Sequence, residues 1–259
     1  MTNTTHHEKR IAELLQGGFH EQVMTFYDHC IRDMGQELSI LDLGAGSGLV
    51  SISLAEKGYT GSIVAYDRDL DCMRQLPAHP KIVKKAGDNV SVLPFSPQAF
   101  DVVICRYAFH HFDNKHGVLK EISRVLKQDG IFLYSDSVLP EHSKNILKPL
   151  YYLREYHFHG YLGYFETLEL LEKAGFQVTL SRPYTYRYES FEKYLEGVVD
   201  GFEEPPPDGF ADCLKQKLKT AWENIDQKTR IEMGIGRIED GFTYHLVDLA
   251  ATRKDINLI

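Results

Sequence analysis

The stretch Ile40-Leu41-Asp42-Leu43-Gly44-Ala45-Gly46-Ser47-Gly48-Leu49 decides the fold of this 259-residue chain. The apolar run up to Leu43 predicts a buried strand, and the apolar spacing that begins at Leu49 predicts a helix. Glycines at alternate positions predict a tight turn, because glycine adopts positive φ and lets the backbone approach a ligand closely. This order is typical of a cradle for an anionic or hydroxyl-rich ligand, although a ligand-free turn has the same local pattern.

Composition and charge narrow the classes of function. The chain carries 29 basic and 37 acidic residues, a net charge of −8, which argues against a broad nucleic-acid footprint and an anionic membrane surface. The four cysteines are scattered without a C-x-x-C pair, so neither a zinc site nor a disulfide framework is indicated. There is no leader-like N-terminus and no apolar stretch near the ~20 residues of a membrane span. We expect a cytoplasmic monomer or homodimer with no metal and no nucleic-acid or membrane partner.

The pattern along the chain predicts an α/β fold. Seven strands are expected, at residues 38–43, 62–66, 81–85, 100–105, 131–135, 176–180 and 242–252. Helical spacing falls between them, including a helix over 118–126 that Asp129-Gly130 should close. Strands that alternate with helices predict a mostly parallel sheet with helices on both faces.

The remaining segments predict a helical cap. We expect N-terminal helices over 1–37, a core over 38–182, a helical insertion over 183–240 and a terminal core strand over 241–259. The insertion is far longer than an ordinary sheet connection. Tyr184, Tyr186 and Tyr188 alternate like one face of a strand, so they either line a pocket or continue the sixth strand.

Several further motifs occur in order with the glycine stretch. They are the acidic end of the second strand, Gly87-Asp88 followed by Leu93-Pro94-Phe95, Phe100-Asp101-Val102-Val103, His110-His111-Phe112, the run from Glu121 to Gly130, and Glu172-Lys173-Ala174-Gly175-Phe176. Together they resemble the methyltransferase type 11 family of class I S-adenosylmethionine (SAM)-dependent methyltransferases, which includes the ubiquinone/menaquinone methyltransferases. The resemblance implies a Rossmann-like fold and SAM as cofactor.

The resemblance also implies roles for the residues at the strand ends. The glycine turn would meet the methionine end of SAM, Asp67 the ribose hydroxyls, Asp88 or Asn89 the adenine amino group, and Arg106 the sulfonium and methionine portion. The full cofactor set is Asp42, Gly44, Ala45, Gly46, Gly48, Asp67, Arg68, Asp88, Asn89 and Arg106.

Elementary chemistry supports the role of Asp67 and leaves alternatives for both Asp67 and Asp88. A carboxylate at a strand end can accept two hydrogen bonds from a vicinal diol, which suits Asp67. Asp67 can equally cap the helix that follows it, and Asp88 can be a plain turn residue. The loop after Asp88 is one residue longer than the family pattern, which leaves the choice between Asp88 and Asn89 open.

Candidates for acceptor chemistry follow the fourth strand. His110 and His111 are candidate general bases, needed only if the acceptor carries its proton at neutral pH; both can instead be packing residues. Aromatic side chains suit a planar or apolar acceptor, and the expected substrate-binding residues are Tyr107, Tyr152, Tyr156 and His157. The same aromatic residues also suit a helix packed on the sheet, and His157-x-His159 alone is a weak metal motif.

Two other functions compete with a small-molecule methyltransferase. One is a SAM-binding regulator or partner subunit without transferase activity. The other is an NAD-dependent oxidoreductase, against which Leu49 argues because it stands where the dinucleotide fingerprint has its third glycine.

Overall fold

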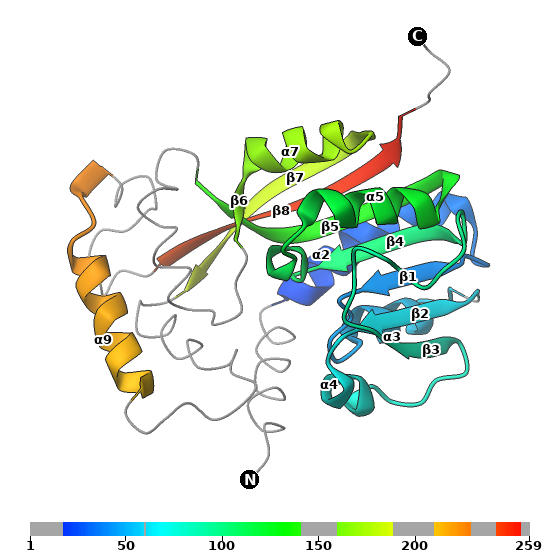
Figure 1. Cartoon of the computed structure of the whole chain (residues 1–259), viewed down its shortest axis with the longest axis horizontal. Coiled ribbons are helices and arrows are strands. Elements are labelled where there is room, and N and C mark those ends of the chain that lie inside the picture. Colours follow the sequence, from blue (N-terminus) through cyan, green and yellow to red (C-terminus); the bar gives the residue numbers. More distant parts are fainter. Residues whose placement is uncertain (1–17, 60, 141–159, 189–209, 229–241, 255–259) are drawn as a thin grey trace. The chain divides into compact units, whose positions relative to one another are not determined.

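The computed structural model describes residues 18–59, 61–140, 160–188, 210–228 and 242–254, and divides into two compact units (Figure 1). The first comprises Phe19–Asp136, Thr167–Arg182 and Val247–Ile259, and we call it the sheet unit. The second comprises Met1–Gly18, Ser137–Glu166 and Pro183–Leu246, and we call it the second unit. Strands β5, β7 and β8 contribute residues to both.

The strands form one sheet in the order β3-β2-β1-β4-β5-β8-β7, with β6 paired to β5. Their bounds are β1 (Ile40–Leu43), β2 (Ile63–Asp67), β3 (Ile82–Ala86), β4 (Phe100–Arg106), β5 (Leu126–Leu139), β6 (Leu162–Gly163), β7 (Phe176–Tyr188) and β8 (Phe242–Arg253). The ladders of β1 with β2 and β4, of β2 with β3, and of β5 with β4 and β6 are all parallel. The arrows of β7 and β8 point in opposite directions (Figure 1), so the mostly parallel sheet that the sequence predicts is confirmed.

The parallel register gathers the carboxyl ends of four strands at one edge. Leu43 lies opposite Tyr66, and Arg106 lies opposite Ser135. The strand order reverses between β1 and β4, which is where open α/β sheets bind ligands. The residues that directly follow β1, β2, β4 and β5 are therefore the first place to look for a site.

Apolar helix faces cover the sheet. The described helices are α2 (Phe19–Ile31), η1 (Arg32–Met34), α3 (Leu49–Glu56), α4 (Leu70–Gln75), η2 (Phe109–His111), α5 (Lys115–Val125), α7 (Tyr164–Lys173) and α9 (Phe210–Glu223). Helix α5 buries Val118, Leu119 and Ile122, and α2 buries Met24 and Tyr27. Figure 1 shows α5 in front of the sheet and α2 behind it, which matches helices on both faces. No helix in the described part of the chain has the length and apolar character to cross a membrane.

Two predicted boundaries are wrong. Helix α5 ends at Val125, and Asp129-Gly130, which were expected to close it, lie within β5, whose Leu126 pairs with Phe100. Gly130 serves close packing there, since a Cβ on it would lie 2.8 Å from the Leu126 side chain. The sixth strand runs on to Tyr188 instead of ending at residue 180, so Tyr184, Tyr186 and Tyr188 do continue it.

The expected cap and insertion remain predictions. Residues from Pro183 onward, including α9, belong to the second unit. Helix α2 belongs to the sheet unit, and its Tyr27 donates to Ser135 Oγ at 2.7 Å. The part of the expected N-terminal helices before residue 18, and residues 189–209 and 229–240 of the expected insertion, lie outside the described residues.

Candidate functional site

The glycine turn joins β1 to α3 and is held by β2. Gly44, Gly46 and Gly48 have φ of 76°, 52° and 76°, as the sequence predicts. The Gly44 amide donates to Tyr66 O at 2.8 Å, and the Ala45 amide donates to the same oxygen at 3.1 Å. A Cβ on Gly44 would lie 2.3 Å from Ala108 Cβ, whereas nothing lies within 4 Å of one on Gly46. The turn is thus packed against the chain that follows β4 and open beside Gly46.

Asp67 ends β2 and organises the backbone on either side of the site. Its Oδ2 accepts from the Gly46 amide at 2.7 Å, and its Oδ1 accepts from the Asp69 amide at 2.9 Å. Each carboxylate oxygen can accept two hydrogen bonds, so both can still receive a ligand hydroxyl. Asp67 therefore forms the turn at the start of α4 and keeps lone pairs that can accept hydrogen bonds from a diol. Arg68, beside it, is exposed.

Asp42 lies inside the sheet, and its described hydrogen bonds fix the helix after the turn. Its Oδ2 accepts from the Ser51 hydroxyl at 2.7 Å and from the Ser51 amide at 3.2 Å. Burial raises the pKa of Asp42 to about 6, although the bonds from Ser51 and the charge of Arg106 act in the opposite direction. Asp42 therefore links β1 to α3 on either side of the glycine turn.

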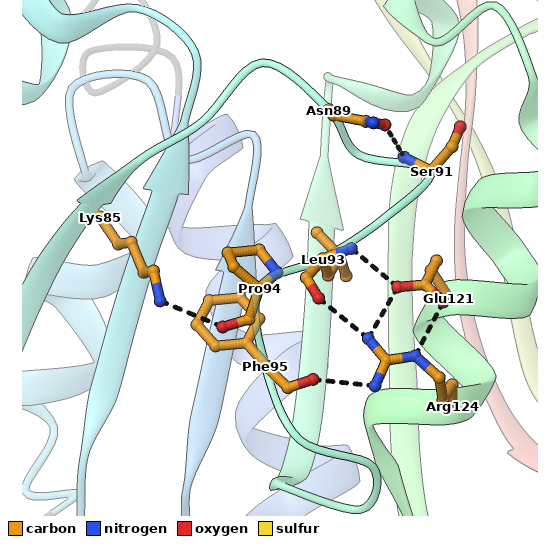
Figure 2. A network of polar contacts seen from close by, with 8 residues as sticks. All are labelled: Lys85, Asn89, Ser91, Leu93, Pro94, Phe95, Glu121 and Arg124. Carbon is orange, nitrogen blue, oxygen red and sulfur yellow. Dashed lines mark hydrogen bonds and ion pairs between the residues drawn. The ribbon is translucent and has the colours of Figure 1, made fainter.

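The loop after β3 carries Asp88 and Asn89, the two candidates for the adenine contact. Asn89 Oδ1 accepts from the Ser91 amide at 3.0 Å, so this side chain closes a local turn (Figure 2). Asp88 is exposed, and its charge contributes, after burial, to a raised pKa of Tyr66. Because Asn89 is used within the loop, Asp88 is the better candidate for a ligand contact.

A polar network from α5 holds this loop in place. Glu121 Oε2 accepts from the Leu93 amide at 2.7 Å (Figure 2). Arg124 donates to Leu93 O at 2.9 Å and to Phe95 O at 2.8 Å, and it also pairs with Glu121. Lys85 donates to Pro94 O at 3.1 Å. Two motifs that the sequence shows only as co-occurring, Leu93-Pro94-Phe95 and the Glu121–Arg124 pair, are therefore partners in space.

Arg106 ends β4 and is only partly paired. Its side chain is buried, 9% exposed, and Nη1 donates to His20 Nδ1 at 2.7 Å. Its Nε and Nη2 are buried without a hydrogen-bonding partner among the described residues. A buried cation with two unsatisfied nitrogen atoms is costly unless an anion accepts their hydrogen bonds. The pattern indicates a site for a carboxylate or a similar anion.

His20 on α2 orients Arg106, a role that no sequence motif indicates. Because arginine can only donate, His20 Nδ1 accepts, and its proton lies on Nε2, 2.8 Å from Ser53 Oγ. Burial, then the charges of Arg106 and Lys57, lower the pKa of His20 to about 4. His20 is therefore neutral at physiological pH and connects α2, α3 and β4.

The lowered pKa of His20 gives a test by pH. We expect the His20→Gln variant, whose amide can accept from Arg106 and donate to Ser53, to resist acid better than the wild type. As pH falls from about 6.5 to about 4, the unfolded wild-type chain takes up a proton at this position before the folded one, so its relative stability falls by roughly 2 kcal/mol. Urea unfolding of both proteins between pH 8 and pH 4 measures the difference. For the exposed His116→Gln, the difference in unfolding free energy from the wild type should not change with pH. The same independence of pH for His20→Gln would contradict a neutral His20.

His110 forms a buried pair with Asp136, which follows Ser135 in β5. His110 Nδ1 lies 2.7 Å from Asp136 Oδ1, and the His110 amide donates to Asp136 Oδ2 at 3.1 Å. The carboxylate is 1% exposed and the imidazole 5%. A carboxylate beside Nδ1 places the ring proton there and leaves the lone pair on Nε2, which is the arrangement of a general base.

The other predicted residues near β4 also gather here. Tyr107 has φ of 50°, rare for a bulky side chain, and its amide donates to Ser135 O at 2.8 Å. The His111 ring lies 4.0 Å from the His110 ring. The planes of the two rings are tilted by 48°, and strained backbone such as that of Tyr107 clusters at functional sites. The predicted substrate residues Tyr152, Tyr156 and His157 lie outside the described residues.

Comparisons with known proteins agree with this geometry. A family model described as "Methyltransferase domain" matches residues 11–181. The "Uncharacterized methyltransferase YcgJ" of Bacillus subtilis is 35% identical over 112 residues, 40% of this chain and 43% of that protein. A "Demethylmenaquinone methyltransferase" of Lactobacillus johnsonii is 36% identical over 98 residues, 35% of this chain and 40% of that protein. The chain thus matches less than half the length of these relatives.

Solved structures share the fold. The crystal structure of the YcgJ protein superposes with a TM-score of 0.70 at 20% identity, covering 85% of this chain and 93% of that one. The crystal structure of a candidate methyltransferase from Bacillus halodurans gives a TM-score of 0.74 at 22% identity and covers 85% and 94%. At such identities the likeness shows the Rossmann-like class I methyltransferase fold.

Proposed function

Since the chain belongs to the methyltransferase domain family, we propose that it transfers a methyl group from SAM to a small-molecule acceptor. The observation that carries the proposal is Arg106, whose buried guanidinium has two nitrogen atoms, Nε and Nη2, unsatisfied among the described residues. The methionine carboxylate of SAM is an anion of the required kind. Arg106 lies in the same compact unit as the glycine turn and Asp67.

The residues at the sheet edge fit the parts of SAM. The Gly44–Gly48 turn would receive the methionine portion, Asp67 the ribose diol and Asp88 the adenine amino group, while Arg106 would pair with the carboxylate. When bound, SAM supplies a methyl group on a sulfonium that an aligned nucleophile can accept. The chain's share of the work is to bind, to align and to exclude water.

The His110–Asp136 pair supports an acceptor that carries a proton, such as a hydroxyl or an amine. Asp136 holds the Nδ1 proton, so Nε2 of His110 can take a proton from the acceptor. The net charge of −8 favours a small molecule over a nucleic acid.

The proposal is tested by ligand binding. We expect S-adenosylhomocysteine (SAH), the reaction product, to bind and to stabilise the fold, and NAD to do neither. Asp67→Asn should weaken SAH binding about ten-fold, because the amide keeps one acceptor and puts an NH₂ against a backbone N–H. Isothermal titration calorimetry measures both, with the exposed Asp129→Asn as control.

The outcomes separate the competing functions. Absence of heat with SAH would contradict the proposal, and heat with NAD would favour an oxidoreductase. SAH binding without any labelled product from SAM and a metabolite extract would favour the non-catalytic regulator.

A further inference from the structure

The loop between β3 and β4 is fixed on both sides of Asp88, the better candidate for the adenine contact. Before Asp88, the Gly87 amide donates to Asp67 O at 3.0 Å and ties the loop to the end of β2. A Cβ on Gly87 would lie 2.1 Å from the Tyr66 hydroxyl, so β2 also packs closely against this residue. After Asp88, helix α5 binds both the amide and the carbonyl of Leu93. The path of the chain that carries Asp88 is therefore set by β2 on one side and by α5 on the other.

The contacts of α5 with this loop depend on one guanidinium. Arg124 donates through Nη2 to Leu93 O at 2.9 Å and through Nη1 to Phe95 O at 2.8 Å (Figure 2). Its Nε and Nη2 also donate to Glu121, at 2.8 and 2.7 Å, and Glu121 Oε2 accepts from the Leu93 amide at 2.7 Å. A planar guanidinium with several N–H donors can make all these bonds in one fixed arrangement, which a lysine ammonium cannot.

The carboxylate of Asp88 is exposed and takes no part in this network (Figure 2). Its neighbour Asn89 does, because Asn89 Oδ1 accepts from the Ser91 amide at 3.0 Å and closes a turn between Asp88 and Leu93. The backbone on both sides of Asp88 is thus held while its side chain stays available to a ligand. Such preorganisation strengthens binding, because less conformational freedom is lost when the ligand arrives.

We propose that Arg124, acting through Glu121 and Leu93, is a positioning residue that makes the cofactor site selective for the amino group of adenine. The inference rests on the proposed function, in which Asp88 accepts a hydrogen bond from that amino group. A hydrogen bond weakens steeply when its distance or angle departs from the optimum. Loss of Arg124 removes the donor from the Leu93 and Phe95 carbonyls. The loop can then move, and Asp88 with it.

The test compares two ligands by isothermal titration calorimetry: SAH, and its purine analogue, in which a hydrogen atom replaces the adenine amino group. Both ligands contain the ribose and the homocysteine, so contacts with Asp67 and Arg106 cancel in the ratio of their dissociation constants. We expect the wild type to bind SAH about ten-fold more tightly than the analogue, and Arg124→Met to reduce this preference to within about two-fold. Arg124→Lys, which keeps the charge but cannot reach every acceptor at once, should retain a preference of about three-fold.

The matched control is Arg253→Met. Arg253 also donates to a backbone carbonyl, Leu126 O at 3.3 Å, but this carbonyl lies at the start of β5 and not in the loop. The variant should keep the ten-fold preference of the wild type. Partial unfolding of any variant changes its affinity for both ligands alike and leaves their ratio unchanged, so the ratio reports on the site and not on stability.

A double-mutant cycle shows whether Arg124 acts through Asp88. Asp88→Ala should abolish the preference, and addition of Arg124→Met to Asp88→Ala should change the ratio by less than about two-fold. A larger further change would overturn the proposal. So would a wild type without preference, or a ten-fold preference that persists in Arg124→Met and Arg124→Lys. If SAH binds to the wild type in these cases, only this inference fails, whereas a wild type that binds neither ligand contradicts the proposed function as well.

Discussion

Arg106→Met is expected to weaken SAH binding by about a hundred-fold and to leave the binding of 5′-methylthioadenosine within about three-fold. The second ligand keeps the adenosine but lacks the amino acid portion. In the structure the guanidinium is buried, is oriented by His20 and has Nε and Nη2 unsatisfied among the described residues. A carboxylate that pairs with both N–H groups would account for this arrangement, and methionine at position 106 offers it no donor.

Calorimetry with both ligands separates carboxylate binding from pocket shape. Arg106→Lys should weaken SAH binding by about ten-fold, less than Arg106→Met, because lysine keeps the positive charge but lacks the planar guanidinium that binds a carboxylate through two hydrogen bonds. Arg187→Met, on an exposed stretch of β7, is the control for loss of a cation. Equal losses for the two ligands would assign Arg106 to shaping the adenosine pocket, and no loss for SAH would place the carboxylate elsewhere.

Most of the fold could be predicted because local sequence patterns mark the strands and helices of the sheet unit. Short apolar runs mark β1, β2 and β4, whose observed bounds differ from the expected ones by at most two residues. The end of α5 could not be predicted this way. Leu126 pairs with Phe100, and Lys127 donates to Asp101 at 2.8 Å. Because of these contacts with β4, the residues after Val125 form a strand of the sheet and do not continue the helix.

The residues of the candidate site also differ in how far the sequence predicts them. Asp67 and the glycines are recognisable because each follows directly after an expected strand. His20 could not be recognised in the sequence, because its role depends on hydrogen bonds with Arg106, 86 residues away, and with Ser53 on another helix. Asp136 did have a signal: it is an acidic residue at the end of the expected fifth strand, just as Asp67 is at the end of the second. Its partner His110, 26 residues away, shows why that position matters.

Asp136→Asn is expected to lower the rate of methyl transfer by about 10²- to 10⁴-fold for an acceptor that must lose a proton, with SAH affinity unchanged. The carboxylate accepts from His110 Nδ1 and from the His110 amide. Asparagine can keep the bond from the amide through its oxygen and turn its NH₂ toward Nδ1. The ring proton then moves to Nε2, and the lone pair that would take the acceptor's proton is lost.

Two measurements check this expectation. Transfer of label from SAM to the acceptor found in a metabolite extract gives the rate, and ¹⁵N spectra of the histidine rings give the tautomer of His110 without any acceptor. The wild type should show the proton on Nδ1 and Asp136→Asn should show it on Nε2, while the exposed Asp129→Asn should match the wild type in both. A changed tautomer with an unchanged rate would mean that no proton passes through His110. In that case the acceptor reaches the site already deprotonated, and Asp136 with His110 only shapes the chain after β4.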